Sequence, residues 1–193
     1  RQRQMCIRDS TIAIFNASIS FDMELIEHDL NGSVAHTKML AKTGIISADE
    51  GEKLLMGLEK IRQEYRSGKF HIVEDAEDVH FAVEKRLTEL TGDVGKKLHT
   101  ARSRNDQVGT DTRLYLREQI EKIRILLRRF QEVILELAES NIETLIPGYT
   151  HLQRAQPLSL AHHLLAYFHK VERDWERLGA VSYTHLTLPT ISR

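Results

Sequence analysis

Two polar segments of the sequence contain residue types that could bind carboxylates and transfer protons. The first, HTARSRNDQ, runs from His99 to Gln107 and holds two arginines among short hydrogen-bonding side chains. The second, PGYTHLQRAQP, runs from Pro147 to Pro157 and contains a histidine. Arginine binds carboxylates through paired N–H donors, and histidine titrates near neutral pH. The segments indicate either an acid–base site for a carboxylate substrate or two ordinary polar loops.

The first segment stands where a long helical pattern begins. A helix N-terminus offers unpaired N–H groups and a partial positive charge, which favour an anion. Ser103, Arg104 and Asn105 would add side-chain donors at the same end. The competing interpretation is that Ser103 or Asn105 only caps the helix and that both arginines are solvated.

The second segment holds His151, the candidate acid–base group, beside Thr150 in a predicted loop. The competing interpretation is a histidine that hydrogen-bonds the loop backbone. Metal and nucleophile chemistry find less support, because the sequence lacks His-Glu-x-x-His, a glycine-rich phosphate loop and Gly-x-Ser-x-Gly. His80 and Glu84 lie one helical turn apart, but a single pair makes no metal site. We therefore expect no metal.

Two long amphipathic helices must position these segments. Apolar residues spaced by four and three predict a helix from about Asn105 to Ser140 with a bundle seam. The seam comprises Leu116, Ile120, Ile123, Leu127, Phe130, Ile134 and Leu137. Such a helix spans roughly 50 Å, so the segments at its two ends could form one site only between subunits.

A second seam follows Pro157, which we place in the first turn of its helix. It comprises Ala161, Leu164, Phe168, Val171, Trp175 and Leu178.

Three shorter helices are predicted upstream. They cover Met23–Thr43, a segment from the capping box Ser47–Glu50 to Ser67, and Ala76–Thr91. We predict an all-α fold with an N-terminal helical domain followed by the start of a central long-helix bundle. The expected division is a tail over 1–10, the first domain over 11–104, the bundle over 105–181 and a tail over 182–193. Both tails lack a helical period and are expected to be non-native.

The composition favours a cytoplasmic protein and gives no indication of a polyanionic partner. Lys and Arg number 27 against 28 Asp and Glu, so the net charge of −1 gives no sign of nucleic-acid binding. No run of 18 apolar residues occurs, and a single cysteine, Cys6, fits a reducing compartment. We expect neither a membrane segment nor a disulfide framework.

Four segments, in their order along the chain, resemble segments of the argininosuccinate lyase family of the fumarase/aspartase superfamily. Besides the two polar segments, they are FNASISFD (15–22) and EDAEDVHFAVEKRL (74–87). The resemblance extends from about Phe15 to Val181. A third family motif, a Gly-Ser-Ser-x-Met-Pro-Gln-Lys loop with a catalytic serine, is absent, so we expect an internal, truncated fragment.

The resemblance implies a reaction and a set of roles. The family splits argininosuccinate into arginine and fumarate by elimination, without a metal or organic cofactor, in a homotetramer whose sites are shared between subunits. Ser103, Arg104 and Asn105 would hold carboxylates. Ser18 and Asn105 would contact substrate in one subunit, and Thr150 would come from another. His151 matches the proton acceptor, acting directly or through another group. Alternatives are a non-catalytic structural protein like the δ-crystallins, another lyase of the superfamily, or a coiled-coil interaction module.

Overall fold

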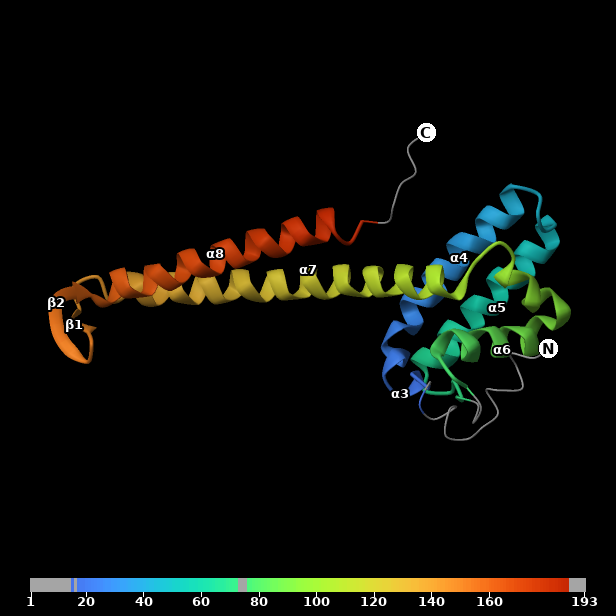
Figure 1. Cartoon of the computed structure of the whole chain (residues 1–193), viewed down its shortest axis with the longest axis horizontal. Helices are drawn as coiled ribbons and strands as arrows, with labels where there is room; N and C mark the ends of the chain where they lie inside the picture. The colour runs from blue at the N-terminus through green and yellow to red at the C-terminus, as the bar shows by residue number, and fades with distance from the viewer. Residues whose placement is uncertain (1–14, 16, 73–75, 188–193) are drawn as a thin grey trace. The chain divides into compact units, whose positions relative to one another are not determined.

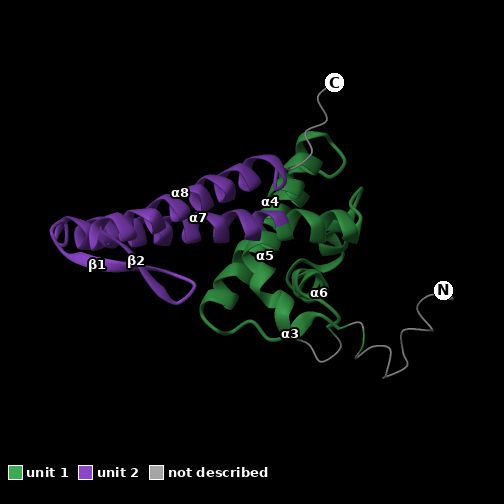
Figure 2. Ribbon diagram, turned by 60° about the vertical axis from the view of Figure 1, so that its left-hand side comes forward, with its two compact units in different colours: residues 1–112 green, residues 113–193 purple. Residues whose placement is uncertain are grey.

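The chain divides into two compact units. The computed structural model describes residue 15 and residues 17–72 and 76–187 (Figure 1). Unit 1 ends at Thr112 and unit 2 begins at Arg113 (Figure 2). The division falls later than the expected boundary at 104, because Gln107 and Asp111 of the long helix are buried within unit 1. The predicted tail 1–10, including Cys6, lies outside the described residues.

Unit 1 contains the three predicted shorter helices. Its elements are α3 (Ile19–Asp22), the 3₁₀ helix η1 (Met23–Leu25), α4 (Ile26–Lys42), α5 (Ala48–Arg66), α6 (Val79–Thr91), the 3₁₀ helix η2 (Gly92–His99) and the first turns of α7. The capping box at Ser47 is present as predicted. Helix α6 begins at Val79 instead of Ala76, because the Asp78 carboxylate accepts the N–H of Phe81 at 2.6 Å and caps the helix there.

The core of unit 1 lies where α4, α5, α6 and η2 meet. Its buried apolar side chains are Ile26, Leu30, Leu40, Ile46, Leu54, Leu58, Ile61, Val79, Val83, Leu87 and Leu98. Asn31–Gly32, a pair that would favour a turn, lies inside α4. A Cβ on Gly32 would lie 3.2 Å from Oδ1 of Asp111, so the glycine allows α7 to approach α4 closely.

Unit 2 contains the rest of α7 (Arg104–Glu139), strands β1 (Leu145–Thr150) and β2 (Gln153–Ser159), and α8 (Leu160–Thr184). Helix α7 is one continuous helix of 36 residues, as predicted. Its side chains contact α8 through an ion pair between Arg128 and Glu172 at 2.6 Å, and the Arg124 and Arg128 guanidinium groups each lie 3.9 Å from the Trp175 ring centroid.

The α7 seam is only partly covered in this chain. Ile120 and Ile134 are buried and Leu127 is half-buried, whereas the alternate seam positions are exposed. The exposed positions are Leu116, Ile123, Phe130 and Leu137. On α8, every predicted seam residue from Ala161 to Leu178 is buried or half-buried. The partial burial of the α7 seam follows because one neighbouring helix covers one side of a seam, whereas a bundle covers both.

The connection between α7 and α8 is a β-hairpin, so the prediction of an irregular loop was wrong. Strands β1 and β2 pair antiparallel, with Thr150 opposite Gln153 and Pro147 opposite Pro157. Pro157 therefore lies in a strand and not in the first turn of a helix; α8 begins after Ser159, whose Oγ accepts the N–H of His162 at 3.2 Å. A two-stranded ribbon has only edge strands, which tolerate proline.

Helix α8 continues to Thr184, three residues into the segment expected to be a tail from 182. Residues 188–193 lie outside the described part of the chain. Within the described residues, none of the helices combines the length and apolar character that crossing a membrane requires.

Candidate functional site

The start of α7 carries three of the predicted substrate-binding residues. The Ser103 Oγ accepts the N–H of Asn105 at 3.2 Å, so this hydroxyl satisfies one free donor at the helix N-terminus. The side chain of Asn105 is exposed. Ser103 therefore acts as a cap, and Asn105 remains open to a ligand.

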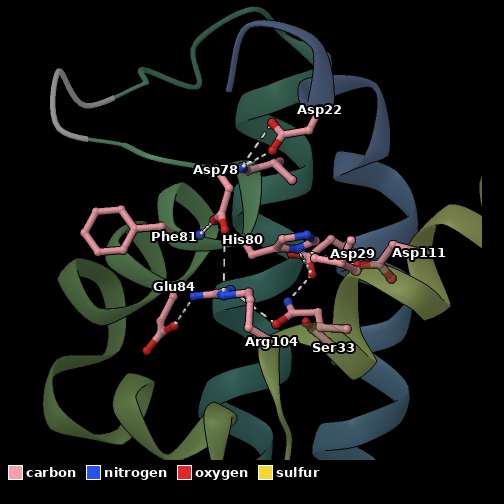
Figure 3. Close-up of polar contacts among 12 residues, drawn as sticks. Asp22, Asp29, Ser33, Asp78, His80, Phe81, Glu84, Arg104 and Asp111 are labelled. Carbon is pink, nitrogen blue, oxygen red and sulfur yellow. Dashed lines mark hydrogen bonds and ion pairs between the residues drawn. The ribbon is translucent and has the colours of Figure 1, made fainter. Parts of the chain in front are cut away.

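Neither arginine of the first segment is a solvated side chain. The Arg104 guanidinium lies 3.3 Å from the Glu84 carboxylate and 3.8 Å from that of Asp78, both close to or on α6 (Figure 3). It also donates to Oε1 of Gln107 at 3.2 Å. Arg102 is half-buried and donates to the Ser33 hydroxyl at 3.3 and 3.4 Å. Unit 1 thus holds both guanidinium groups in defined positions.

Ser18 is linked to the same end of α6. Its hydroxyl donates to Oδ2 of Asp22 at 2.6 Å, and the Asp22 carboxylate accepts the N–H of Val79 at 3.2 Å. Ser18 also donates its backbone N–H to the carbonyl of Glu77 at 2.9 Å. Because Arg104 pairs with Asp78, the N-terminus of α6 connects Ser18 with the start of α7. The structure therefore brings Ser18, Ser103, Arg104 and Asn105 into one unit.

A buried polar cluster behind these residues was missed by the sequence reasoning. Asp29 of α4, His80 of α6 and Asp111 of α7 are 0%, 2% and 1% exposed. The Nδ1 atom of His80 lies 3.0 Å from Oδ1 of Asp29 and 3.5 Å from Oδ2 of Asp111. Figure 3 shows the three side chains gathered between their helices. The available signal was polar residues within an apolar stripe, since Asp29 and Ser33 recur at helical spacing with Ile26 and Leu30.

The ionisation of this cluster departs from ordinary behaviour. Burial and the neighbouring Asp29 carboxylate raise the pKa of Asp111 to about 7. Burial disfavours the imidazolium of His80, but the two aspartates outweigh it and raise the pKa of His80. Burial opposes ionisation of Asp29, but hydrogen bonds from His80 and Gln107 prevail and lower the pKa of Asp29. Asp111 consequently gains or loses its proton near neutral pH.

The same three residues could be considered as metal ligands, since their donor atoms lie within 4.8 Å of one another. However, Oδ1 of Asp29 already faces donors from His80 and Gln107, and Arg102 exerts its positive charge on both carboxylates. Protein cations and protons therefore offset the buried negative charge. We assign no metal to the cluster.

Two cavities lie beside the cluster in unit 1. A small one of about 10 Å³ has walls that include His80, Arg102, Arg104 and Gln107. A larger cleft of about 300 Å³ is lined by Gly32, His36, Met39, Arg102, Asp106, Gln107, Thr110 and Asp111. Arg102 and Gln107 line both, so they separate the small cavity from the open cleft.

Thr150 and His151 lie in unit 2, at the end of the hairpin. Both are exposed, and His151 and Leu152 form its two-residue turn with φ values of 50° and 63°. Two successive positive φ values are the pattern of a type I′ turn, which prefers Asn-Gly. Histidine and leucine adopt this conformation at a steric cost, and strain of this kind is concentrated at functional sites.

Comparisons with known proteins find relatives of high sequence identity. The chain is 76% identical over 170 residues to an argininosuccinate lyase of Trichormus variabilis, covering 88% of this chain and 37% of the relative. It is 76% identical over 171 residues to an argininosuccinate lyase of Nostoc punctiforme, covering 89% of this chain and 37% of the relative. A solved EDDS lyase in complex with formate superposes with a TM-score of 0.73 at 25% identity, covering 83% of this chain and 31% of that chain.

The chain thus spans little more than a third of the length of these curated relatives. A family model described as Lyase matches residues 3–192, nearly the whole sequence. That match includes both polar segments, the helix α6 that contacts the first segment, and the hairpin that contains the second. The chain therefore belongs to this lyase family.

Proposed function

We propose that this chain is part of an argininosuccinate lyase, which eliminates fumarate from argininosuccinate and releases arginine. The identity of 76% to two enzymes of that name supports the substrate. The elimination removes a proton beside a carboxylate and builds negative charge on that carboxylate. The site must therefore provide fixed donors for carboxylates and a group that accepts a proton.

In this proposal the start of α7 provides the donors. The side chain of Arg104 is 31% exposed, and Asp78 and Glu84 hold its guanidinium in place. A preorganised donor loses less entropy on binding than a freely moving surface arginine. Asn105 adds an exposed amide, and Ser18 and Ser103 complete the proposed substrate-binding set of unit 1.

The observation that carries the proposal for His151 is its turn geometry. Asn-Gly would form the same two-residue turn with less strain, so the turn does not require histidine at this position. A histidine kept at a conformational cost is better explained by chemistry, and an exposed imidazole can accept or donate a proton. We assign His151 to proton transfer and Thr150 beside it to substrate binding.

The proposal includes the assembly. The uncovered half of the α7 seam, with Leu116, Ile123, Phe130 and Leu137 exposed, requires further helices. We propose that neighbouring subunits supply them in a homotetramer, and that Thr150 and His151 complete the site of another subunit. We further propose a cytoplasmic location.

The test uses a chimera with the Trichormus variabilis argininosuccinate lyase, because this chain covers 37% of that enzyme's length and the chimera supplies the rest. The aligned segment of this chain replaces its counterpart in the Trichormus variabilis enzyme, and fumarate release is measured. His151→Asn should lower kcat by roughly 100-fold or more, with a smaller effect on KM. Asparagine suits the turn better than histidine does, so the loss cannot be assigned to a broken hairpin.

Leu152→Gly is the matched control, since it relaxes the same turn and keeps the imidazole. It should retain kcat within a factor of about three, less than removal of an acid–base group would cost. A chimera without activity would refute the proposed reaction and favour a non-catalytic protein. Near-normal kcat in His151→Asn would remove His151 from proton transfer while leaving the reaction in place.

A further inference from the structure

A continuous hydrogen-bond chain joins the buried His80 to Arg104. Nδ1 of His80 lies 3.0 Å from Oδ1 of Asp29, and that oxygen also accepts a hydrogen bond from Nε2 of Gln107. The Oε1 atom of the same Gln107 side chain accepts a hydrogen bond from Nη1 of Arg104 at 3.2 Å. Gln107 is 5% exposed, so water does not compete strongly for these bonds. The buried cluster and the proposed substrate-binding arginine are therefore coupled through one amide.

Asp111 adds a buried carboxylate whose hydrogen-bonding capacity is only partly used. Its Oδ2 atom is buried without a hydrogen-bond partner and lies 3.5 Å from Nδ1 of His80. One N–H cannot serve two carboxylates equally well, and Asp29 is the closer acceptor. Asp111 follows Gln107 by one turn of α7, so a change in its charge acts on the turn that holds Arg104.

Charged groups surround the cluster from every packed element. The anions are Asp29 on α4, Asp78 and Glu84 at α6, and Asp106 and Asp111 on α7; the cations are Arg102 and Arg104, and the histidines are His36, His80 and His99. These opposite charges partly offset one another. The gain or loss of one buried proton consequently changes the local charge by one unit, at a site from which water is largely excluded.

We propose that Asp29, His80 and Asp111 form a proton-carrying positioning triad, which acts through Gln107 to set the position of the Arg104 guanidinium. The triad residues touch no substrate in this proposal; they orient a group that does. Protonation of Asp111 removes its repulsion with Asp29 and keeps α7 against α4 and α6. Loss of that proton near neutral pH weakens this packing and loosens the link to Arg104. The role of the triad in substrate affinity depends on the proposed function, whereas its coupling to Arg104 does not.

The first experiment tests the coupling without activity. The full chain is labelled with ¹⁵N-arginine and ¹⁵N-histidine and titrated, and Arg104→Lys identifies the Arg104 Nε signal. This signal should shift with a midpoint close to that of Asp111, near pH 7. Gln107→Met, which cuts the link, should abolish the shift, and Asp111→Asn, which removes one of the two groups of the triad whose pKa is raised, should change its midpoint.

The matched control is Gln131→Met, which replaces another buried glutamine of α7 that is 2% exposed and lies in unit 2. It should leave the Arg104 shift unchanged. A wild-type Arg104 signal without a step near neutral pH would overturn the proposal. So would a step in Asp111→Asn that keeps the wild-type midpoint. Asn has nearly the same shape as Asp, so Asp111→Asn is expected to fold. It therefore provides the test even if Gln107→Met does not fold.

The second experiment measures the consequence for substrate in the chimera. Gln107→Met should raise KM about tenfold, the usual effect of losing a hydrogen bond to a charged group, and change kcat less. Wild-type KM should rise as pH increases through 7, whereas Asp111→Asn should show a flatter profile. An active chimera whose KM is unaffected by Gln107→Met would refute the positioning role. An inactive chimera would refute the proposed reaction, and the Arg104 signal would still decide the coupling.

Discussion

Replacing Asp111 with asparagine should stabilise unit 1 at alkaline pH, although it removes a buried charge next to a histidine. The pKa of Asp111 rises from 3.8 to about 7 because the carboxylate is buried and faces Asp29. A difference of about three pKa units corresponds to about 4 kcal/mol of cost for the ionised form. The same substitution deprives His80 of an anionic neighbour, which offsets part of the gain. We therefore expect a net stabilisation of about 1–3 kcal/mol.

The pH dependence has a definite sign. Between about pH 4 and pH 7 folded Asp111 binds a proton that the unfolded chain has released, so stability falls as pH rises. The raised pKa of His80 acts in the same direction, since its stabilisation is present below pH 6.5 and is lost as pH increases through the folded value. Asp111→Asn removes the first contribution and weakens the second. The difference between variant and wild type should be small near pH 4 and largest above pH 7.

Urea unfolding of the full chain, followed by circular dichroism at about pH 4.5 and about pH 8, measures the effect. Protein concentration is held constant, because self-association adds to apparent stability. A destabilisation of more than about 1 kcal/mol at the higher pH would refute the reasoning. It would mean that the attraction between Asp111 and His80 exceeds the combined cost of burial and of repulsion from Asp29.

Three further predictions concern other parts of the chain. Leu152→Gly should stabilise the hairpin by about 1 kcal/mol, because glycine adopts a positive φ without steric cost, and urea unfolding of the full chain checks this. Gly32→Ala should destabilise unit 1 by about 1 kcal/mol despite the better helix propensity of alanine, since its Cβ would lie 3.2 Å from Asp111; a gain in melting temperature would contradict it. The full chain expressed alone should self-associate through the exposed half of the α7 seam and show no lyase activity, so a stable monomer in sedimentation or measurable fumarate release would disprove this.

Local periodicity was sufficient to predict the helices. The spacing of Leu116 to Leu137 and of Ala161 to Leu178 indicates two long helices and their apolar faces, because a side chain's direction on a helix depends only on its place in the 3.6-residue repeat. The capping box at Ser47 could be recognised for the same reason, since its partners lie three residues apart. The clustering of donors at Ser103, Arg104 and Asn105 was also visible, because helix starts have a local signature.

Features that depend on contacts between distant segments could not be predicted in this way. His151 and Leu152 carry no turn signal, and strand pairing between β1 and β2 imposes positive φ values that neither residue prefers. Gln107 reaches Asp29 across 78 positions of sequence, so only the packing of α7 against α4 and α6 brings the buried cluster together. The sequence by itself determined which residue types could handle carboxylates and protons. The tertiary structure decided which of them share a low-dielectric environment, and there the same aspartates and histidine acquire shifted pKa values and a connection to Arg104.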